Sequence, residues 1–205
     1  LFASTDVGRQ VKLGDGWGTI TGYTSGTVVT WTITEAATGS GGTEWSLGAF
    51  SDTTGIPSAT CFFEQRLIFS GTNTEPQTLY FSKSGDYENM TSGTEAADAM
   101  VYTIASNQVN AIRYLKSQRT LVIGTTGGEY TLSAEGTGAA VTPTNITIKK
   151  QSSYGSANVD ALTVGNAVIF LQRAKRKLRE LAYNFDQDSY TAPDLTILND
   201  VVTES

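Results

Sequence analysis

Apolar and polar residues alternate with a period of two along much of this chain, and glycine-containing turns interrupt the alternation. In the N-terminal part, three such segments occupy residues 7–13, 16–23 and 27–34. Turn signals at Gly14-Asp15-Gly16 and Ser25-Gly26 separate them. Short alternating segments joined by tight turns are typical of antiparallel strands. We therefore expect residues 1–50 to form a small antiparallel unit, either a meander or, as we predict, a β-barrel.

From about residue 57 the alternating segments come in pairs joined by a turn. The pairs are 66–70 with 78–82, 120–123 with 129–132, and 167–171 with 178–183. Further strand candidates lie between the pairs, at 100–104, 109–115, 145–149 and 161–164. The second pair follows the first after about 53 residues and the third follows after about 47, which is the period of a β-propeller blade. This pattern predicts four strands in each repeat.

The predicted fold is all-β, with under about a tenth of the residues in helix because Thr, Val and aromatic residues favour strands. A small β-barrel at residues 1–50 is followed by β-propeller-like four-stranded blades at 51–205. The boundary is placed in segment 48–58, which carries few strongly apolar residues. Three repeats are fewer than the roughly 4–8 blades of a closed propeller, so the blades are expected to form a partial propeller. The chain begins at Leu1 without a signal pattern, and we expect a fragment of a longer protein.

The composition excludes some classes of catalytic and metal-binding site. The sequence contains no histidine, which excludes Ser-His-Asp and Cys-His catalysis and histidine-based metal sites. The net charge of −6 argues against a general nucleic-acid binder, which is expected to be basic. Cys61, the one cysteine, lies in the apolar run 60–63 and is expected to be a buried small hydrophobic residue. No apolar run approaches the ~20 residues of a membrane-spanning helix, so no membrane partner is expected.

Two acidic segments are candidate binding sites. Asp186-Gln187-Asp188 with Asp194 offers the oxygen ligands that Ca²⁺ requires, but the Gly and Glu of a full calcium loop are absent, so a solvated turn is favoured. Ser84-Gly85-Asp86-Tyr87 has a faint similarity to the Asp-containing turns of sialidase-type propellers, without the Gly and Trp that follow there. Asp86 and Glu88 are expected to cap backbone donors of a turn.

Two glycine-containing segments do not predict a phosphate loop, because neither 14–18 nor 127–129 lies between a strand and a helix. No pair of carboxylates stands out for glycoside hydrolysis. The sequence therefore predicts no catalytic, cofactor-binding or metal-binding residue, and no cofactor.

Five basic residues occur within seven positions: Arg173, Lys175, Arg176, Lys177 and Arg179. Such a cluster can contact phosphate groups. It can also be a charged hairpin turn that discourages edge-to-edge pairing of strands. Because the whole chain is acidic, we predict a solvent-exposed turn from Arg173 to Arg179 without specific DNA affinity.

Several longer segments carry a resemblance to a known family. They are 62–72 with 76–78 and 82–89, 127–130, and 141–146 running on to 151–156, together with Arg179-Glu180-Leu181, Tyr183 and Asp194-Leu195-Thr196. Over about residues 57–200 the chain resembles tail proteins of short-tailed phages and prophages, of the tail nozzle or tail tubular protein B group. Residues 2–33 are also similar to the small β-barrel insert of ubiquitin-activating enzymes, a likeness of fold alone.

The resemblance implies a structural, non-catalytic component of a bacteriophage tail. Nozzle-type proteins form a ring below the portal around a DNA channel, so the implied partners are copies of the chain and other tail and portal proteins. The implied location is the virion, after a soluble stage in the host cytoplasm. An acidic channel wall suits this role because like charge repels the DNA backbone and lets it slide.

An alternative function is a host-glycan-binding or glycan-cleaving propeller module of a phage or bacterium. Aromatic side chains that can stack on sugars are Trp17, Trp31, Trp45, Tyr80 and Tyr154. The favoured interpretation is that they fill cores and hairpin faces. Two carboxylates and an exposed aromatic side chain in one cleft would distinguish a glycan-cleaving module.

Overall fold

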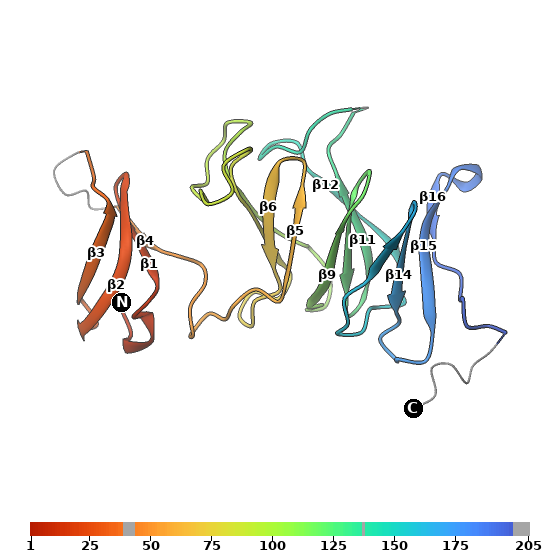
Figure 1. The fold of residues 1–205 in the computed structure, drawn as a ribbon, viewed down its shortest axis with the longest axis horizontal. Coiled ribbons are helices and arrows are strands. Elements are labelled where there is room, and N and C mark those ends of the chain that lie inside the picture. Colours follow the sequence, from red (N-terminus) through yellow and green to blue (C-terminus); the bar gives the residue numbers. More distant parts are fainter. Residues whose placement is uncertain (39–43, 137, 199–205) are drawn as a thin grey trace. The chain divides into compact units, whose positions relative to one another are not determined.

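The computed structural model describes residues 1–38, 44–136 and 138–198 (Figure 1). Strands account for 49% of the chain and helix for 3%. Within the described ranges the helical residues are two short 3-10 segments, η1 (Ser4–Asp6) and η2 (Phe185–Gln187). The prediction of an all-β chain is therefore confirmed. No helix in this part of the chain is long and apolar enough to cross a membrane.

The chain divides into two compact units. The first comprises Leu1–Ile56 with Thr72–Thr74, and the second comprises Pro57–Gly71 and the chain from Glu75 onward. The division lies within segment 48–58, where the sequence places the domain boundary. Thr74 belongs to the first unit because its backbone N–H and its Oγ1 both donate to the carbonyl oxygen of Thr54, at 3.3 and 2.7 Å.

The first unit is one four-stranded antiparallel sheet in the order β3-β2-β1-β4. Its strands are β1 (Gln10–Leu13), β2 (Gly16–Ser25), β3 (Val28–Glu35) and β4 (Trp45–Leu47). Among the described residues of this unit, the outer strands β3 and β4 are not paired with each other. The closure that a barrel requires therefore stays a prediction, whereas the antiparallel sheet itself is observed.

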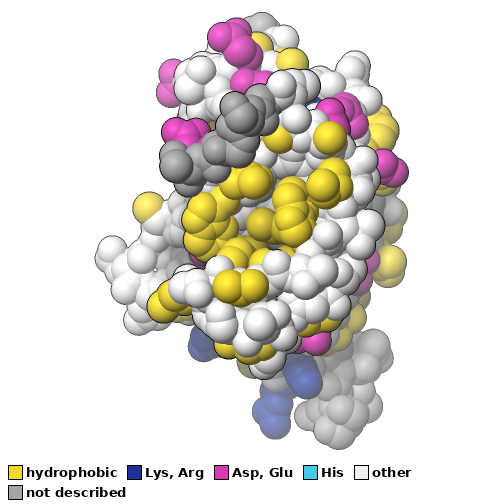
Figure 2. Space-filling view, turned by 90° about the vertical axis from the view of Figure 1, so that its left-hand side faces the viewer, with side chains coloured by type: hydrophobic (Ala, Val, Ile, Leu, Met, Phe, Trp, Pro, Cys, Tyr) yellow, Lys and Arg dark blue, Asp and Glu magenta, His cyan; other side chains and the backbone are white. Residues whose placement is uncertain are grey.

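Strand pairing places apolar side chains on one face of this sheet. Val11 pairs with Gly18 and Leu47, and Gly18 pairs with Ile33, so their side chains point to the same side. Trp45 joins them through its pairing with Leu13 and contacts Phe2, with ring centroids 5.0 Å apart. Ile33 and Trp45 are about half exposed, and Figure 2 shows apolar side chains gathered on this unit.

The second unit contains three four-stranded sheets, and in each one the strands pair in chain order. The first sheet consists of β5 (Ala59–Phe63), β6 (Arg66–Ser70), β7 (Thr78–Phe81) and β8 (Met100–Thr103). The second consists of β9 (Ile112–Ser117), β10 (Leu121–Thr125), β11 (Gly128–Ser133) and β12 (Thr147–Ser152). The third consists of β13 (Leu162–Val164), β14 (Ala167–Leu171), β15 (Leu178–Asn184) and β16 (Ser189–Thr191). The three predicted hairpins are confirmed as the pairs β6–β7, β10–β11 and β14–β15.

The three sheets pack face to face like successive propeller blades (Figure 1). One apolar core joins the first sheet to the second, and a separate core joins the second sheet to the third. Strand β10 shows why the middle sheet is apolar throughout: Leu121 and Ile123 enter the first core, whereas Val122 between them enters the second. The predicted four-stranded blades of a partial propeller are thus present in the second unit.

The outer faces of the three-sheet stack also carry apolar side chains. On the first sheet, Phe62 and Val101 are more than half exposed. On the third sheet, Leu162 and Val164 are more than half exposed and stand on the side opposite Val168, which is buried in the second core. Both outer faces of the stack are therefore partly apolar, like the faces that are buried between its sheets.

Candidate functional site

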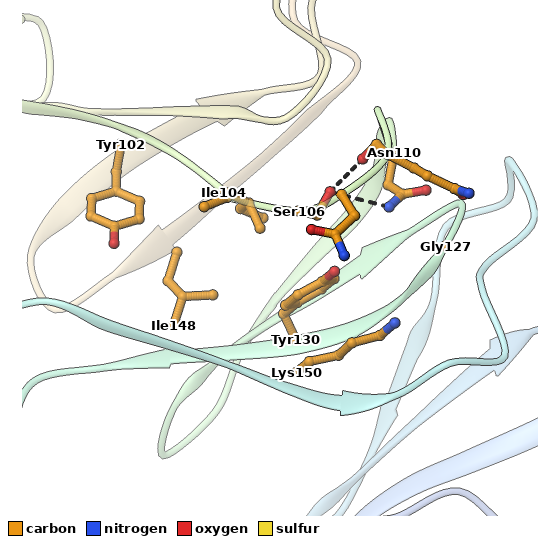
Figure 3. Close-up of a pocket in the computed structure, with 11 residues that line it drawn as sticks. Tyr102, Ile104, Ser106, Asn110, Gly127, Tyr130, Ile148 and Lys150 are labelled. Carbon is orange, nitrogen blue, oxygen red and sulfur yellow. Dashed lines mark hydrogen bonds between the residues drawn. The ribbon is translucent and has the colours of Figure 1, made fainter.

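An open groove of about 470 Å³ lies in the second unit beside the first core (Figure 3). One wall is the connection from β8 to β9, which includes Ile104, Ser106 and Asn110. The other side is formed by Tyr130 of β11 and by Lys150 of β12. The groove thus joins a polar loop to two neighbouring strands of the middle sheet.

The polar wall is organised around the hydroxyl of Ser106. This oxygen accepts hydrogen bonds from Gln77 Nε2 at 2.8 Å and from Asn110 Nδ2 at 3.3 Å, and it donates to the carbonyl oxygen of Gln108. Asn110 lies directly over Gly127, where a Cβ would come within 2.2 Å of Asn110 Oδ1. The position of the Asn110 amide therefore depends on glycine at 127.

Tyr130 and Lys150 are direct cross-strand partners, so both side chains stand on the same face of the middle sheet. The Tyr130 ring is packed in the first core and the residue is only 6% exposed. Figure 3 shows its hydroxyl directed into the groove. Among the described residues, neither a hydrogen bond to this hydroxyl nor an ion pair of Lys150 is present.

The opposite face of β11 holds a buried carboxylate, Glu129, which is fully inaccessible to solvent. Ser156 Oγ donates to its Oε1 at 2.9 Å, Ser152 Oγ donates to its Oε2, and the backbone N–H of Gly155 also donates to the carboxylate. Burial raises the pKa of Glu129 above its ordinary value of 4.5, although these hydrogen bonds act in the opposite direction. Glu129 is thus held by three donors from residues 152–156, at the end of β12 and in the connection that follows it.

That segment, residues 152–157, connects the second sheet to the third, and we call it the interblade latch. On one side, the backbone N–H of Ser156 donates to the carbonyl of Thr125 at 2.8 Å. On the other side, Ala157 N donates to the Leu171 carbonyl at 2.9 Å, and Arg173 N donates to the Gly155 carbonyl at 2.8 Å. The interblade latch is therefore hydrogen-bonded to both sheets, with Glu129 anchoring it from within.

The prediction of a solvent-exposed turn from Arg173 to Arg179 is wrong at Arg179, which is buried. It is 8% exposed, lies inside β15 and pairs with Phe170, so its side chain points toward the second core. Its guanidinium carbon lies 3.4 Å from the ring centroid of Tyr154, and its Nη1 donates to the carbonyl of Ala192 at 2.7 Å. Arg179 is a structural residue of the third sheet, because the turn ends before it.

The remaining basic residues lie in the exposed turn between β14 and β15: Arg173, Lys175, Arg176 and Lys177. Lys177 Nζ is 2.9 Å from Asp194 Oδ2. The hydrogen bond from Lys177, with those from Thr196, lowers the pKa of Asp194 to about 2. Part of the predicted positive tip is therefore neutralised within the molecule.

The acidic residues considered for calcium do not converge. Asp194 forms an ion pair with Lys177 and accepts a hydrogen bond from Thr196. Asp188 follows η2 and accepts a hydrogen bond from the hydroxyl of Tyr183. In the ranges that the structure describes, no group of three or more Asp, Glu, Cys or His side chains is arranged to hold a metal ion.

The segment Ser84–Tyr87 forms a turn, as the sequence predicts. Backbone hydrogen bonds close it, including Gly85 N to the Gln65 carbonyl at 2.8 Å and Asp86 N to the Lys83 carbonyl at 3.3 Å. The expected capping by the carboxylates of Asp86 and Glu88 is wrong for the described residues, because neither carboxylate accepts a hydrogen bond there and backbone bonds close the turn.

The five aromatic residues that are candidates for stacking on sugars do not line the groove. Tyr80 is buried, and its hydroxyl donates to Glu75 Oε2 at 2.9 Å. Tyr154 supports Arg179, and Trp45 is packed against Phe2. Trp17 donates to Glu35 from a half-buried position, and Trp31 is half-buried too. No carboxylate lines the groove, so it is not the paired-carboxylate centre that glycan cleavage requires.

No protein-family model matches the chain, and no curated protein matches its sequence. The resemblance to tail proteins therefore rests on the segments quoted above. In the structure, three of those segments meet around the interblade latch, through Glu129, Ser156 and Arg179.

Sequence reasoning missed Glu129, Tyr130 and Lys150 as a functional set. One signal was present: a charged residue in an otherwise uncharged, strand-forming segment is costly to bury unless it has partners. The segment 128–133 contains one such residue, Glu129. The partners themselves come from the end of β12 and the loop after it, more than twenty residues later, and no local pattern identifies them.

The raised pKa of Glu129 predicts a specific pH dependence. The unfolded chain ionises this carboxyl near 4.5, whereas the folded chain resists ionisation until higher pH. The free energy of unfolding should therefore fall as the pH rises from 4.5 toward the folded pKa, because the unfolded state loses its proton first. The decline should be absent in Glu129→Gln. Urea unfolding of both proteins across this range tests it, and parallel curves for the two would contradict it.

Cys61 is half-buried against the first core rather than fully buried, because β5 is the outer strand of its sheet. Burial still raises the pKa of its thiol to about 12. We therefore expect iodoacetamide to alkylate Cys61 at least about a hundredfold more slowly in the folded chain than in urea, since the thiolate is the reactive form. Mass spectrometry of timed reactions measures both rates, and equal rates would show an accessible, ordinary thiol.

Proposed function

We propose that this chain is a structural, non-catalytic component of a bacteriophage tail, of the nozzle or tail-tube type. The proposal rests on where the segments that resemble tail proteins lie in the fold. Glu129 is hydrogen-bonded to Ser156 of the interblade latch, and Arg179 of the third sheet stacks on Tyr154 of the same latch. Glu129, Ser156 and Arg179 all belong to those segments and help to tie successive sheets to one another. Residues used in this way serve stiffness and assembly, which is what a tail protein requires.

The surface of the second unit supports an assembled state. Both outer faces of the sheet stack expose apolar side chains, among them Phe62 and Leu162 at 58% and 67%. Large exposed apolar patches mark surfaces that partners cover. In this proposal the partners are neighbouring copies of the chain in a ring, with other tail and portal proteins above and below it. The chain resides in the virion and passes through the host cytoplasm before assembly.

The net charge of the chain suits a channel through which DNA passes without being bound. The net charge is −6, and part of the basic turn is paired with Asp194. A ring with an acidic channel repels the DNA backbone and lets it pass, whereas a basic channel would retain it. The proposal therefore includes no specific nucleic-acid site and no membrane partner.

Disruption of the reading frame in the phage or prophage that encodes it tests the proposal. We expect DNA-filled or DNA-leaking heads without finished tails in electron micrographs, and restoration of infectious particles by the intact chain supplied from a plasmid. Normal tails and undiminished infectivity after disruption would overturn it. A matched control is disruption followed by complementation with Lys149→Ala, an exposed change that should restore infectivity fully.

A further inference from the structure

We propose that the groove beside the first core binds an acidic oligosaccharide, with a sugar carboxylate paired to Lys150. The inference is independent of the proposed tail function. It begins from Tyr130, whose ring is packed in the first core while its hydroxyl points into the groove, without a hydrogen bond to another described residue. A ligand hydroxyl can therefore bond to it by displacing water, without breaking a bond inside the protein.

The opposite wall is already ordered to bind a polar ligand. Ser106 fixes Asn110 through the 3.3 Å hydrogen bond, and the bond from Gln77 fixes Ser106. The Asn110 side chain is confined over Gly127. A pre-ordered amide costs little conformational entropy on binding, and amides are suited to sugar hydroxyls because they both donate and accept.

The groove also provides an apolar strip for the carbon face of a sugar ring. Tyr102 and Ile148 lie along the same groove as Tyr130 (Figure 3). Pockets that bind small ligands combine an apolar lining with a few polar groups that fix orientation. The combination of aromatic and aliphatic surface with a hydroxyl, an amide and a cation matches a sugar better than a purely apolar ligand.

Lys150 selects the charge of the ligand. Its ammonium group is exposed, has no ion-pair partner among the described residues and stands on the same sheet face as Tyr130. A single cation matches a single carboxylate. Single-stranded nucleic acid is disfavoured because it requires several cations along its backbone, whereas the chain carries a net charge of −6.

Isothermal titration calorimetry with the whole chain tests the proposal. The probes are a hexamer of galacturonic acid, a neutral hexamer of glucose, and a ten-nucleotide oligothymidylate. We expect measurable binding of the acidic hexamer, at least about tenfold weaker binding of the neutral one, and none of the nucleotide. Absence of binding by the acidic hexamer, or equal binding of the two sugars, would overturn the proposal, as would tighter binding of the oligothymidylate, which would assign the groove to nucleic acid.

Three variants assign the binding to the groove. Lys150→Ala should weaken binding of the acidic hexamer about tenfold and leave the neutral hexamer nearly unchanged. Tyr130→Phe keeps the ring in the core and should weaken both sugars about fivefold, because one hydrogen bond is lost. Lys149→Ala is the matched control, since its partner Thr131 places it on the other face of the sheet. Unchanged affinity in the first two variants, or equal loss in all three, would overturn the assignment.

Discussion

Replacing Gly155 with alanine is expected to lower the free energy of unfolding of the second unit by about 3 kcal/mol. Gly155 has a φ of +71°, which L-residues with a side chain rarely adopt. A Cβ at this position would also lie 2.3 Å from the carbonyl oxygen of Thr126, a backbone atom. The interblade latch would have to shift, and the hydrogen bonds that join the two sheets through it would weaken.

A matched control separates the two causes. Gly85 has a similar φ of +74°, but a Cβ there would meet no atom within 4 Å. Gly85→Ala should therefore cost only the conformational strain, about 1 kcal/mol. Urea unfolding followed by far-ultraviolet circular dichroism measures both variants. Equal losses would show that the interblade latch does not constrain the packing of the sheets.

Tryptophan fluorescence provides an internal reference for these measurements. Trp17, Trp31 and Trp45 are the three tryptophans of the chain, and all belong to the first unit. The fluorescence transition should keep its midpoint in both glycine variants if the two units unfold independently. A shared shift in both signals would mean that the units unfold together and that the division into two units has no energetic meaning.

Arg66→Ala is expected to destabilise the second unit by about 4 kcal/mol. Arg66 is 2% exposed, and burial lowers the pKa of its guanidinium. Its Nη1 donates to the carbonyls of Ser82 and Asp98 at 2.8 and 2.7 Å, and its Nη2 donates to that of Ala96 at 2.6 Å. Alanine would leave a cavity and three carbonyl groups without their donor, and would release segment 82–98 from the first sheet.

Limited proteolysis detects that release directly, because the variant should be cut within residues 83–97 under conditions that leave the parent chain intact. Arg113→Ala is the control: Arg113 is half-buried and donates one 3.4 Å hydrogen bond to Asn158, so its loss should cost below about 1 kcal/mol. If the two arginine variants were equally stable and equally resistant to protease, the assigned role of Arg66 would be wrong.

The strand pairs of the second unit could be predicted because local signals fix them. Turns set the register of each hairpin, and an apolar segment such as 121–123 is typical of a strand covered on both faces. The alternation of Arg179, Leu181 and Tyr183 with their neighbours predicts the strand at 178–183, and β15 confirms it.

The contacts that join the sheets could not be predicted in the same way. Arg179 belongs to a run of basic residues in the sequence, and only the pairing of Leu178 with Leu171 shows that the turn ends before it. Its two-residue spacing from the buried Leu181 was the available signal. The environment of Glu129 depends on how the connection 152–157 crosses between sheets, which is a property of tertiary packing.

The groove was missed for a similar reason. Ser106 and Asn110 belong to a loop without regular structure, whereas Tyr130 and Lys150 belong to strands that follow much later in the chain. Each residue taken alone is ordinary. The arrangement becomes informative only when the sheet pairing places Tyr130 beside Lys150 and the core orients its hydroxyl outward.

The central proposal, that the chain is built into a phage tail, is tested most directly by locating it in particles. If the proposal holds, the chain is encoded by a phage or prophage, whose virions can be purified and labelled with a gold-conjugated antibody raised against residues 57–198. We predict gold at the tail, on the side of the head that carries the portal, and the chain among the particle proteins identified by mass spectrometry. Particles that infect normally but contain none of the chain would contradict the claim.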